Sequence, residues 1–580
     1  MAFRAGRIEK TWTGYVRIGG ERLRLFILLG LIIGVATGAV WIYFSTWGTG
    51  SQHLLEYANV SFKASVGSAE PAAVEISGKV YRGDAERIRE WMQEHWYGGR
   101  SIGDLARETL YAGLSGAVIA ILLILYWSTR TSLDGDDETV RGPRLYRPQD
   151  LNRELKAEAR KRGDAMGLEI GEVQIDKRAE ASHLLLLGDS GAGKSSMIRL
   201  LLGQIRANGE AAIVYDPERE FLADFFIPGL DTILNPLDER SPYWSPWEEV
   251  HQPADMESLA MSFVPEPPQD GGNAKFWIES ARTLFVALLE QLPLRGDRNP
   301  HSISRSLNSP LEQLEQLISD TPAANAVNSA APQQAQGVLA TLGIAARSLK
   351  LLRPASPGVP RFSAFEWSRK PKGWVFLCST EQHRKATLPL VSVWIDCLIR
   401  PLLDGSLEEG KVTPVWLVAD ELHTLQRLAT LPDILTRGRK FGLRSIVGTQ
   451  SMAQFQSLYG NDSKTLLSQP KTKLIYRCSE PETAKWSSDL IGQVERITHR
   501  SSMSVSGKES FSLSDERRID PLILPSEIQK MPDLTCFMIH AGKVTQLRMP
   551  IVHRLHRYEG FVARKDDAAL EAEAVALTAA

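Results

Sequence analysis

The residues best suited to chemistry form a glycine-rich segment that follows the apolar run HLLLL and precedes the helix-like stretch SMIRLLLGQI. Its pattern is GxxxxGK[ST], in which backbone N–H groups curl around a phosphate and a helix N-terminus adds positive potential. Lys194 can then reach the β- and γ-phosphates of a nucleotide, and the Ser195 hydroxyl can bind Mg²⁺. We therefore predict that ATP and Mg²⁺ are held by Gly188, Asp189, Ser190, Gly191, Ala192, Gly193, Lys194, Ser195 and Ser196.

Two carboxylates follow another apolar run and are suited to complete a phosphoryl-transfer site. The run at residues 415–419 resembles a buried strand and ends in Asp420 and Glu421. Alone this pattern is weak, because acidic residues often begin the loop after a strand. Paired with the glycine-rich loop, it indicates Asp420 as a Mg²⁺ ligand and Glu421 as the general base that polarises water. After the next strand-like run, Gln450 is placed to sense the γ-phosphate, although a polar residue is also ordinary there.

A basic segment, residues 436–442, lies between the acidic pair and Gln450. Its three cations, Arg437, Arg439 and Lys440, fall within four residues and would usually form a solvated face. In a ring of P-loop subunits, the same segment can project into the site of a neighbour. Both interpretations stay open from the residues alone.

An alternation of apolar runs and helical patterns must position these groups. Strand-like runs occur at residues 184–187, 211–215, 374–378, 415–419, 445–447 and 473–476. This alternation is typical of an α/β fold with a mainly parallel sheet. A long insertion separates the second run from the third. Its section at 299–352 lacks strand patterns and is rich in Ala, Leu, Gln and Ser, so we predict an all-α domain there.

Two uncharged apolar segments near the N-terminus, residues 25–44 and 109–129, have the length that a helix needs to cross a bilayer. A signal peptide and a buried helix are the alternatives, but no small-residue cleavage site follows the first segment and aromatic residues lie where an interfacial belt would be. Lys and Arg precede the first segment and follow the second, whereas residues 45–62 contain none. We therefore predict two transmembrane helices with both termini cytoplasmic.

The same argument assigns residues 45–108 to a small periplasmic module. This module contains no cysteine to staple it. Because so short a segment buries little core, we expect it to lean on a partner or on a neighbouring copy.

Length and composition limit the class of protein. A chain of 580 residues is too long for one ordinary domain, and its 43% hydrophobic and 23% charged residues exclude a disordered chain or a wholly embedded transporter. The net charge of −2 means that DNA or a membrane surface must be held by a local patch. The four cysteines are far apart and form no CxxC pair, so we expect reduced core residues.

The predicted domain order follows from these segments. Residues 130–180 are rich in charge, Gly and Pro and are predicted to be a linker with a short helix near residues 152–162. The complete order is a cytoplasmic N-terminus at 1–24, a span at 25–44, the periplasmic module at 45–108, a span at 109–129, the linker at 130–180, the nucleotide-binding motor at 181–298 and 353–563 around the all-α domain at 299–352, and a flexible tail at 564–580.

Several separated motifs together carry a family resemblance. The two spans, GDSGAGKSS, YDPEREF, ILNPLDERSPYW, KFWIESARTLF, VWLVADELHTLQRL, RGRKFGLRSIVGTQ and LPSEIQKMPDLTCFMIHAG are similar to those of type IV coupling proteins of the TraD/TrwB kind, in the FtsK/RecA-like motor superfamily. The resemblance implies a bacterial inner-membrane ATPase that forms a homo-hexamer, with a RecA-like P-loop NTPase domain and a small all-α domain. It also implies that this ATPase passes relaxase-bound single- or double-stranded DNA to a type IV secretion channel, with the relaxosome and inner-membrane secretion components as partners.

The resemblance also implies roles for single residues. Lys194 and Ser195 stand at Walker A positions, Asp420 and Glu421 at Walker B positions. Gln450 stands at the sensor glutamine and Arg439 at the arginine finger, with Arg437 as the nearby alternative for the finger. The chain ends soon after His556 with a short tail, so no relaxosome-docking extension is expected.

Other functions compete with an ATP-driven DNA translocase. One is a coupling ATPase or receptor that recruits protein substrates to a type IV secretion system without pumping DNA; stimulation of ATPase activity by DNA would separate the two. A chromosome-segregation pump of the FtsK type would need a long linker and a DNA-reading winged-helix segment, which we do not find. An ABC transporter fits poorly, because no LSGGQ-like signature lies between the Walker elements.

Overall fold

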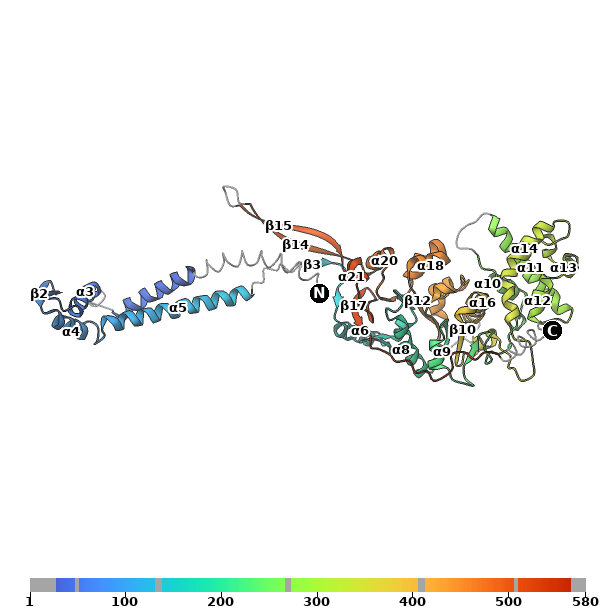
Figure 1. Cartoon of the computed structure of the whole chain (residues 1–580), viewed down its shortest axis with the longest axis horizontal. Coiled ribbons are helices and arrows are strands. Elements are labelled where there is room, and N and C mark those ends of the chain that lie inside the picture. The colour runs from blue at the N-terminus through green and yellow to red at the C-terminus, as the bar shows by residue number, and fades with distance from the viewer. Residues whose placement is uncertain are drawn as a thin grey trace, which may run out of the picture. The chain divides into compact units, whose positions relative to one another are not determined.

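The computed structural model of this chain describes residues 28–46, 52–130, 138–266, 273–404, 413–504 and 510–564. The chain separates into two compact units, residues 1–136 and residues 137–580 (Figure 1). The predicted cytoplasmic N-terminus at 1–24 lies outside the described residues, as do residues 25–27 of the first predicted span and residues 565–580 of the predicted tail.

The first unit contains two long apolar helices. One covers Leu28–Ser45 and the other, α5, covers Ile102–Arg130. Both are long and apolar enough to cross a membrane, and many of their aliphatic side chains are exposed. Small residues let the two backbones approach closely, because a Cβ atom placed on Gly34 would lie 2.9 Å from the carbonyl oxygen of Gly113. The number of spans and their orientation stay predictions.

A small module separates these helices in the sequence. It consists of α3 (Leu54–Ser65), the antiparallel strands β1 (Ala72–Ile76) and β2 (Lys79–Gly83), and α4 (Ala85–His95). Tyr57 and Tyr97 stack with ring centroids 4.3 Å apart and are buried together with Met92. The module therefore has a small core of its own, built without cysteine.

A ten-stranded sheet forms the centre of the second unit. Its strand order is β4-β17-β16-β13-β7-β12-β11-β8-β10-β9. The bounds are β4 (Leu145–Tyr146), β7 (Leu184–Leu187), β8 (Ala211–Asp216), β9 (Thr232–Leu234), β10 (Trp374–Cys378), β11 (Val415–Ala419), β12 (Leu443–Thr449), β13 (Thr472–Ile475), β16 (Thr535–His540) and β17 (Lys543–Arg548). The seven strands from β13 to β9 in this order are parallel to one another.

The six strand-like runs of the sequence are therefore strands of one sheet, as predicted, but the sheet is mixed. The hairpin of β16 and β17 adds antiparallel pairs beside β13, and β4 joins β17 in parallel. This hairpin escaped the sequence analysis because its strands are consecutive and contribute no βα alternation.

Both faces of the sheet are covered, which explains why its central strands are continuous apolar runs. In β8, Ile213 and Tyr215 enter one hydrophobic cluster while Ala212 and Val214 enter the other. Helices α6 (Pro148–Arg162) and α8 (Lys194–Ala207) supply side chains to the second cluster. All four cysteines are free and buried, as expected for reduced core residues.

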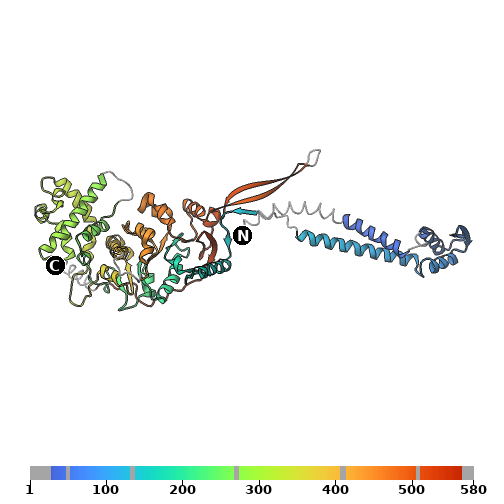
Figure 2. The same ribbon diagram turned by 180° about the vertical axis from the view of Figure 1, so that it is seen from behind.

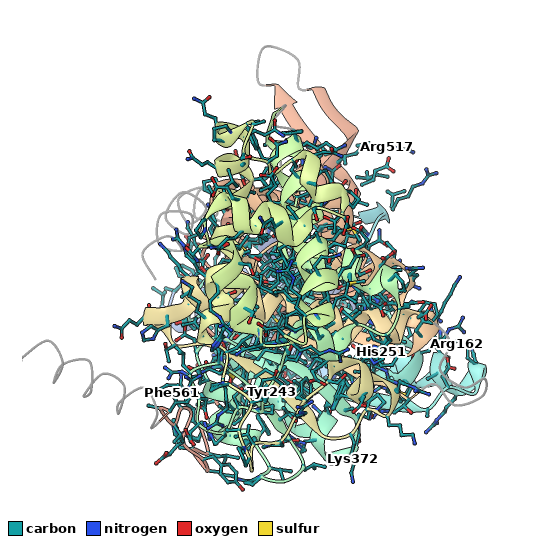
Figure 3. All side chains as sticks on the ribbon, turned by 90° about the vertical axis from the view of Figure 1, so that its right-hand side faces the viewer. Arg162, Tyr243, His251, Lys372, Arg517 and Phe561 are labelled. Carbon is teal, nitrogen blue, oxygen red and sulfur yellow. The ribbon has the colours of Figure 1, made fainter. Side chains whose placement is uncertain are left out.

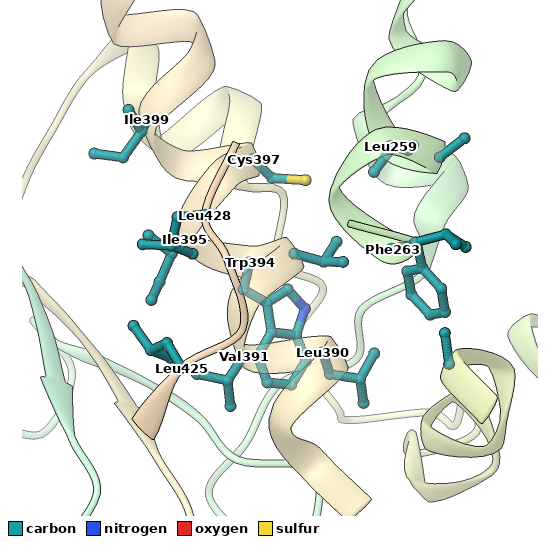
Figure 4. Packing of buried hydrophobic residues seen from close by; sticks show 14 of the residues in the cluster. Leu259, Phe263, Leu390, Val391, Trp394, Ile395, Cys397, Ile399, Leu425 and Leu428 are labelled. Carbon is teal, nitrogen blue, oxygen red and sulfur yellow. The ribbon is translucent and has the colours of Figure 1, made fainter. Parts of the chain in front are cut away.

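Helix α16 (Arg384–Leu403) belongs to the core although its hydropathy would allow it to cross a membrane. Its Leu390 and Trp394 are almost fully buried. Figure 4 shows them beside Leu259 and Phe263 of α10 (Pro253–Phe263). Burial against other helices, rather than lipid, therefore accounts for its apolar sequence.

Helices gather at one end of the second unit (Figures 1 and 2). Within residues 299–352 the structure describes helical elements and no strand, in agreement with the helical pattern of the sequence. They are α12 (Pro300–Leu307), α13 (Leu311–Ile318), α14 (Pro332–Ala346) and the 3₁₀ turns Pro322–Asn325 and Arg347–Leu351, next to α11 (Asn273–Leu294). Figure 3 views the unit from this end. That these helices form a separate domain stays a prediction.

Most of the predicted linker at 130–180 is folded against the sheet. It contains β3 (Glu138–Arg141), β4, α6, the antiparallel pair β5 (Met166–Ile170) and β6 (Val173–Asp176), and α7 (Lys177–Glu180). Leu151, Leu155 and Ala159 of α6 are buried at a spacing of four residues. The charge that suggested a linker lies on the other faces of this amphipathic helix, so composition alone was misleading.

A long hairpin projects from the second unit (Figures 1 and 2). Its strands β14 (Gln493–Ser504) and β15 (Ser510–Pro521) pair along twelve positions, and β3 joins β14 to complete a three-stranded sheet.

Candidate nucleotide-binding site

The glycine-rich loop runs from the carboxyl end of β7 to the first residue of α8, which is the strand, loop and helix order that its sequence predicted. Gly188 and Gly193 have φ values of 155° and 116°. A Cβ atom on Gly188 would lie 2.5 Å from the Cβ atom of Tyr476, and one on Gly193 would lie 3.0 Å from a methyl of Leu534. Glycine is therefore required both by the backbone turn and by the close approach of later segments.

Lys194 points back into this loop. Its Nζ donates hydrogen bonds to the carbonyl oxygens of Gly188 at 2.7 Å and Asp189 at 3.0 Å. Burial lowers the pKa of the ammonium, while the nearby carboxylates of Asp420 and Glu421 raise it. The cation thus occupies the concave side of the loop, where a phosphate would replace the two carbonyls as its partner.

Ser195 and Asp420 meet although 225 positions separate them in the chain. The Ser195 hydroxyl donates to Oδ2 of Asp420 at 2.5 Å. Oδ1 of Asp420 is buried and has no hydrogen-bond partner among the described residues, and burial raises the pKa of this carboxyl to about 6. A bound cation would satisfy the unpaired oxygen, so this pair of oxygen donors fits Mg²⁺.

No group of three or more His, Cys, Asp or Glu side chains suited to a metal ion occurs in the part of the chain that the structure describes. A site with one carboxylate and one hydroxyl suits Mg²⁺ that takes its remaining ligands from phosphates and water. The residues present therefore fit a metal that arrives with a nucleotide.

Glu421 and Gln450 are also brought together. Nε2 of Gln450 donates to Oε1 of Glu421 at 3.0 Å. These residues follow the neighbouring parallel strands β11 and β12, whose carboxyl ends share one edge of the sheet. The carboxylate predicted as general base is thus oriented by the amide predicted as sensor.

Ser190, Gly191 and Ser196 complete the predicted phosphate loop. Ser190 and Gly191 lie at its exposed tip, and Ser196 lies in the first turn of α8. Ala192 is buried, and its carbonyl oxygen accepts a hydrogen bond from the Leu534 amide at 2.9 Å. The loop is therefore anchored on one side and open on the other.

Several contacts at this site were missed by the sequence analysis. The Asp189 carboxylate accepts hydrogen bonds from the backbone amide of Ser479 and, at 2.5 Å, from its hydroxyl. The Tyr215 hydroxyl lies 2.7 Å from Oγ1 of Thr424, which donates to the carbonyl oxygen of Glu421. No spacing signal could have revealed the contacts of Asp189 with Ser479 and of Tyr215 with Thr424, because each joins segments far apart in the chain.

His423 is a further polar residue beside Glu421 that the sequence analysis did not single out. Its Nδ1 is buried without a hydrogen-bond partner among the described residues. Burial lowers the pKa of the imidazole, so the ring is neutral at physiological pH.

Arg439 lies apart from the other predicted catalytic residues. It belongs to the 3₁₀ turn Gly438–Phe441, which precedes β12, whereas Gln450 follows that strand. The seven residues of β12 extend over about 20 Å at roughly 3.3 Å each. Arg437 also precedes β12, at the end of α17 (Leu431–Arg437), and it pairs with Asp433 at 2.9 Å. Neither arginine therefore reaches the glycine-rich loop of its own chain.

Comparison with known proteins gives a consistent result. The family model described as the type IV secretion-system coupling protein DNA-binding domain matches residues 167–551, more than half of the chain. The coupling protein TraD of Escherichia coli (strain K12) is 26% identical over 554 residues, which cover 91% of this chain and 74% of TraD.

Solved structures agree with this match. The bacterial conjugative coupling protein TrwBdeltaN70, in an unbound form, is 28% identical with a TM-score of 0.64. The match covers 73% of this chain and 96% of the TrwBdeltaN70 chain. The plasmid coupling protein TrwB in complex with ADP and Mg²⁺ is 27% identical with a TM-score of 0.64, and the match covers 74% of this chain and 99% of the TrwB chain.

Proposed function

This chain belongs to the family of type IV secretion-system coupling proteins, and we propose that it is an inner-membrane ATPase that couples the relaxosome to the secretion channel and drives DNA transfer in conjugation. The observation that carries the proposal is the convergence of Lys194, Ser195, Asp420, Glu421 and Gln450 at the carboxyl edge of adjacent parallel strands. Ligands of open α/β sheets bind at this edge.

Each residue has a distinct role in the proposed hydrolysis. Ser195 and Asp420 would hold Mg²⁺, which supplies charge neutralisation at the phosphate oxygens when bound. The Lys194 ammonium exchanges its two loop carbonyls for phosphate oxygens. Glu421 accepts the proton of the attacking water, and Gln450 holds the Glu421 carboxylate in place through its amide.

The arginine finger acts between subunits in this proposal. Arg439 precedes β12 at the edge opposite the nucleotide loop, which supports a contribution to the site of a neighbouring copy. A guanidinium supplied in trans raises phosphoryl-transfer rates by about 10³–10⁵. Hydrolysis would therefore depend on closure of a homo-hexameric ring through heterologous contacts.

Membrane anchoring rests on the apolar helices Leu28–Ser45 and α5. We propose that both cross the inner membrane, with residues 45–108 in the periplasm and the second unit in the cytoplasm. Reporter fusions test this topology: a fusion at Gly67 should report an external position and a fusion at Gly163 an internal one. An external signal at Gly163 contradicts it.

ATPase measurements on the full chain in detergent or nanodiscs, with and without single- and double-stranded DNA, test the function. We expect DNA to stimulate hydrolysis, and Lys194→Ala and Glu421→Gln to lower it by about 10²–10³ because each removes one electrostatic group from the transition state. Near-normal turnover by either variant would refute the site assignment. Stimulation by a relaxase protein but not by DNA would favour the alternative, a receptor that recruits protein substrates without pumping DNA.

A further inference from the structure

A row of cations lies at the edge of the sheet opposite the nucleotide site. Arg178 precedes β7, Arg439 precedes β12 and Lys471 precedes β13. These three strands are neighbours in the order β13-β7-β12 and run parallel. Adjacent strands are separated by about 4.8 Å, so the starts of these three strands span about 10 Å.

The three cations line one surface pocket of about 310 Å³. All three residues are exposed, and none forms an ion pair with a carboxylate of the described residues. An unpaired surface cation is ordinary by itself. Three that share one pocket create a local positive field suited to an anion with several charged oxygens.

The carboxylates of this pocket already have partners. Glu158 accepts a hydrogen bond from Nζ of Lys543 at 2.5 Å. Asp176 accepts one from Arg162 at 2.6 Å and one from the Ala179 amide at 2.7 Å. The charges of these acids are thus offset locally.

His540 adds no charge to the pocket. Its Nδ1 lies 2.8 Å from Oγ1 of Thr472, and burial lowers the pKa of the ring to about 4. The positive charge of Arg178, Arg439 and Lys471 therefore stays uncompensated at neutral pH.

The backbone holds the three cations in a fixed relation. The Lys471 amide donates to the carbonyl oxygen of Ser182 at 2.9 Å, which ties the start of β13 to the residues before β7. Arg178 lies on α7, where Asp176 provides the N-terminal cap. Burial lowers the pKa of the His183 ring, just before β7, and the nearby charge of Arg439 lowers this pKa further. The segments that carry the three cations are therefore held together by the fold of the chain.

The same strands carry opposite halves of a site at their two ends. The glycine-rich loop follows β7 and Gln450 follows β12, whereas Arg178 and Arg439 precede these strands. A cation row at one edge and a phosphate loop at the other cannot meet within a chain. They can meet between copies that associate head to tail, which is the contact that closes a ring.

We propose that Arg178 and Lys471 act with Arg439 as a three-cation edge that binds the polyphosphate of a nucleotide held by the phosphate loop of a second copy of this chain. The proposal rests on the proposed function and extends the contribution in trans from one arginine to three cations. Arg439 serves the transferring phosphoryl group, and Arg178 and Lys471 hold the remaining phosphate oxygens in the ground state.

Single variants of the full chain separate these roles. Arg178→Gln and Lys471→Gln should each raise the KM for ATP about tenfold, because each removes one charge-assisted hydrogen bond to phosphate. Their kcat should change little, whereas Arg439→Ala should lose kcat. Lys161→Gln is the matched control, because Lys161 is an exposed cation next to the pocket residue Arg162 but does not line the pocket; it should behave as the wild type.

Mixed rings test whether the cations act across subunits. Glu421→Gln subunits, which keep the cation edge, are combined with subunits that carry Arg178→Gln, Lys471→Gln and Arg439→Ala together and keep their own phosphate loop. If the cations act in trans, half of the mixed interfaces contain a complete site, and ATPase activity should exceed the sum of the separate proteins at least tenfold. No gain in verified mixed rings overturns the proposal.

Two further results would also overturn it. An unchanged KM in both Arg178→Gln and Lys471→Gln means that these cations do not contact the nucleotide; if Lys194→Ala and Arg439→Ala are still inactive, the proposed function stands without this edge. An unchanged KM together with weaker binding of a DNA oligonucleotide, or of vesicles containing an anionic lipid, assigns the edge to those phosphates instead.

Discussion

Replacement of Arg444 by methionine should destabilise the second unit more than any comparable surface change. Arg444 follows the first residue of β12, and its Nη1 lies 2.5 Å from Oε2 of Glu180 and 3.3 Å from Oε2 of Glu210. Glu180 is fully buried, and its Oε1 accepts the Leu168 amide at 2.7 Å. Removing the guanidinium therefore leaves a buried carboxylate without its principal counter-charge.

The expected magnitude follows from this burial. Breaking a buried ion pair by removing one partner costs about 3–5 kcal/mol. The Lys177 ammonium stays 3.5 Å from Glu180 but is itself 35% exposed, so it compensates only in part and we expect about 3 kcal/mol. A loss of this size lowers the unfolding midpoint of a unit as large as residues 137–580 by about 3 °C.

Thermal unfolding of the full chain, followed by intrinsic fluorescence, would measure this loss. Arg437→Met is the matched control, because Arg437 pairs with Asp433 while their side chains are 52% and 47% exposed. Exposed pairs contribute less than about 1 kcal/mol. Equal midpoint shifts for Arg444→Met and Arg437→Met would refute the reasoning.

The pH dependence gives a second check. Burial raises the pKa of Glu180 above its ordinary value of 4.5, and Arg444 opposes this rise. The buried carboxylate therefore costs stability above its unfolded pKa, and protonation relieves that cost as the pH falls. Without Arg444 the pKa of Glu180 rises further. The free energy of unfolding that Arg444→Met loses relative to the wild type should therefore be largest at neutral pH and should shrink towards pH 5. A deficit that is constant between pH 5 and 8 would contradict this account.

The remaining predictions concern the nucleotide site and the apolar helices. Gln450→Ala should lower kcat about tenfold to a hundredfold with nucleotide affinity retained, because Glu421 loses the amide that orients it; a change in affinity alone would contradict this role. Asp420→Asn should lose the gain in nucleotide affinity that Mg²⁺ gives the wild type, so that it binds nucleotide as the wild type does in EDTA, and calorimetric titration with and without Mg²⁺ would measure both. Gly34→Leu should lower the thermal stability of the chain in detergent, because a side chain there meets the backbone of α5, whereas the exposed Ala36 should tolerate leucine.

The phosphate loop could be predicted from the sequence because its chemistry is local. Eight consecutive residues contain the glycines, the lysine and the hydroxyl, and the flanking apolar run and helix place them. Central strands such as β7 and β11 were equally clear, because burial on both faces leaves continuous apolar runs. The pairing of Asp420 with Ser195 followed from two patterns that only a shared sheet edge could join.

Contacts between distant segments could not be predicted in this way. Of the residues that support the phosphate loop, Ser479 comes from a segment with no signal of its own, and the motif that contains Leu534 did not indicate a contact with the loop. The charged stretch around α6 was taken for a linker because composition does not tell which face of a helix is buried.

Local residue patterns were enough to identify the residues that carry nucleotide chemistry and the order along the chain of the strands that bear them. The folded chain adds that the strand between Arg439 and Gln450 lies beside β7 and β11, so that Arg439 lies at the edge of the sheet opposite the phosphate loop. Only the tertiary structure decided that Arg178 and Lys471 lie beside Arg439. The reason is physical: strand order and direction in a sheet arise from packing between segments far apart in the chain, and no local spacing encodes which strands become neighbours.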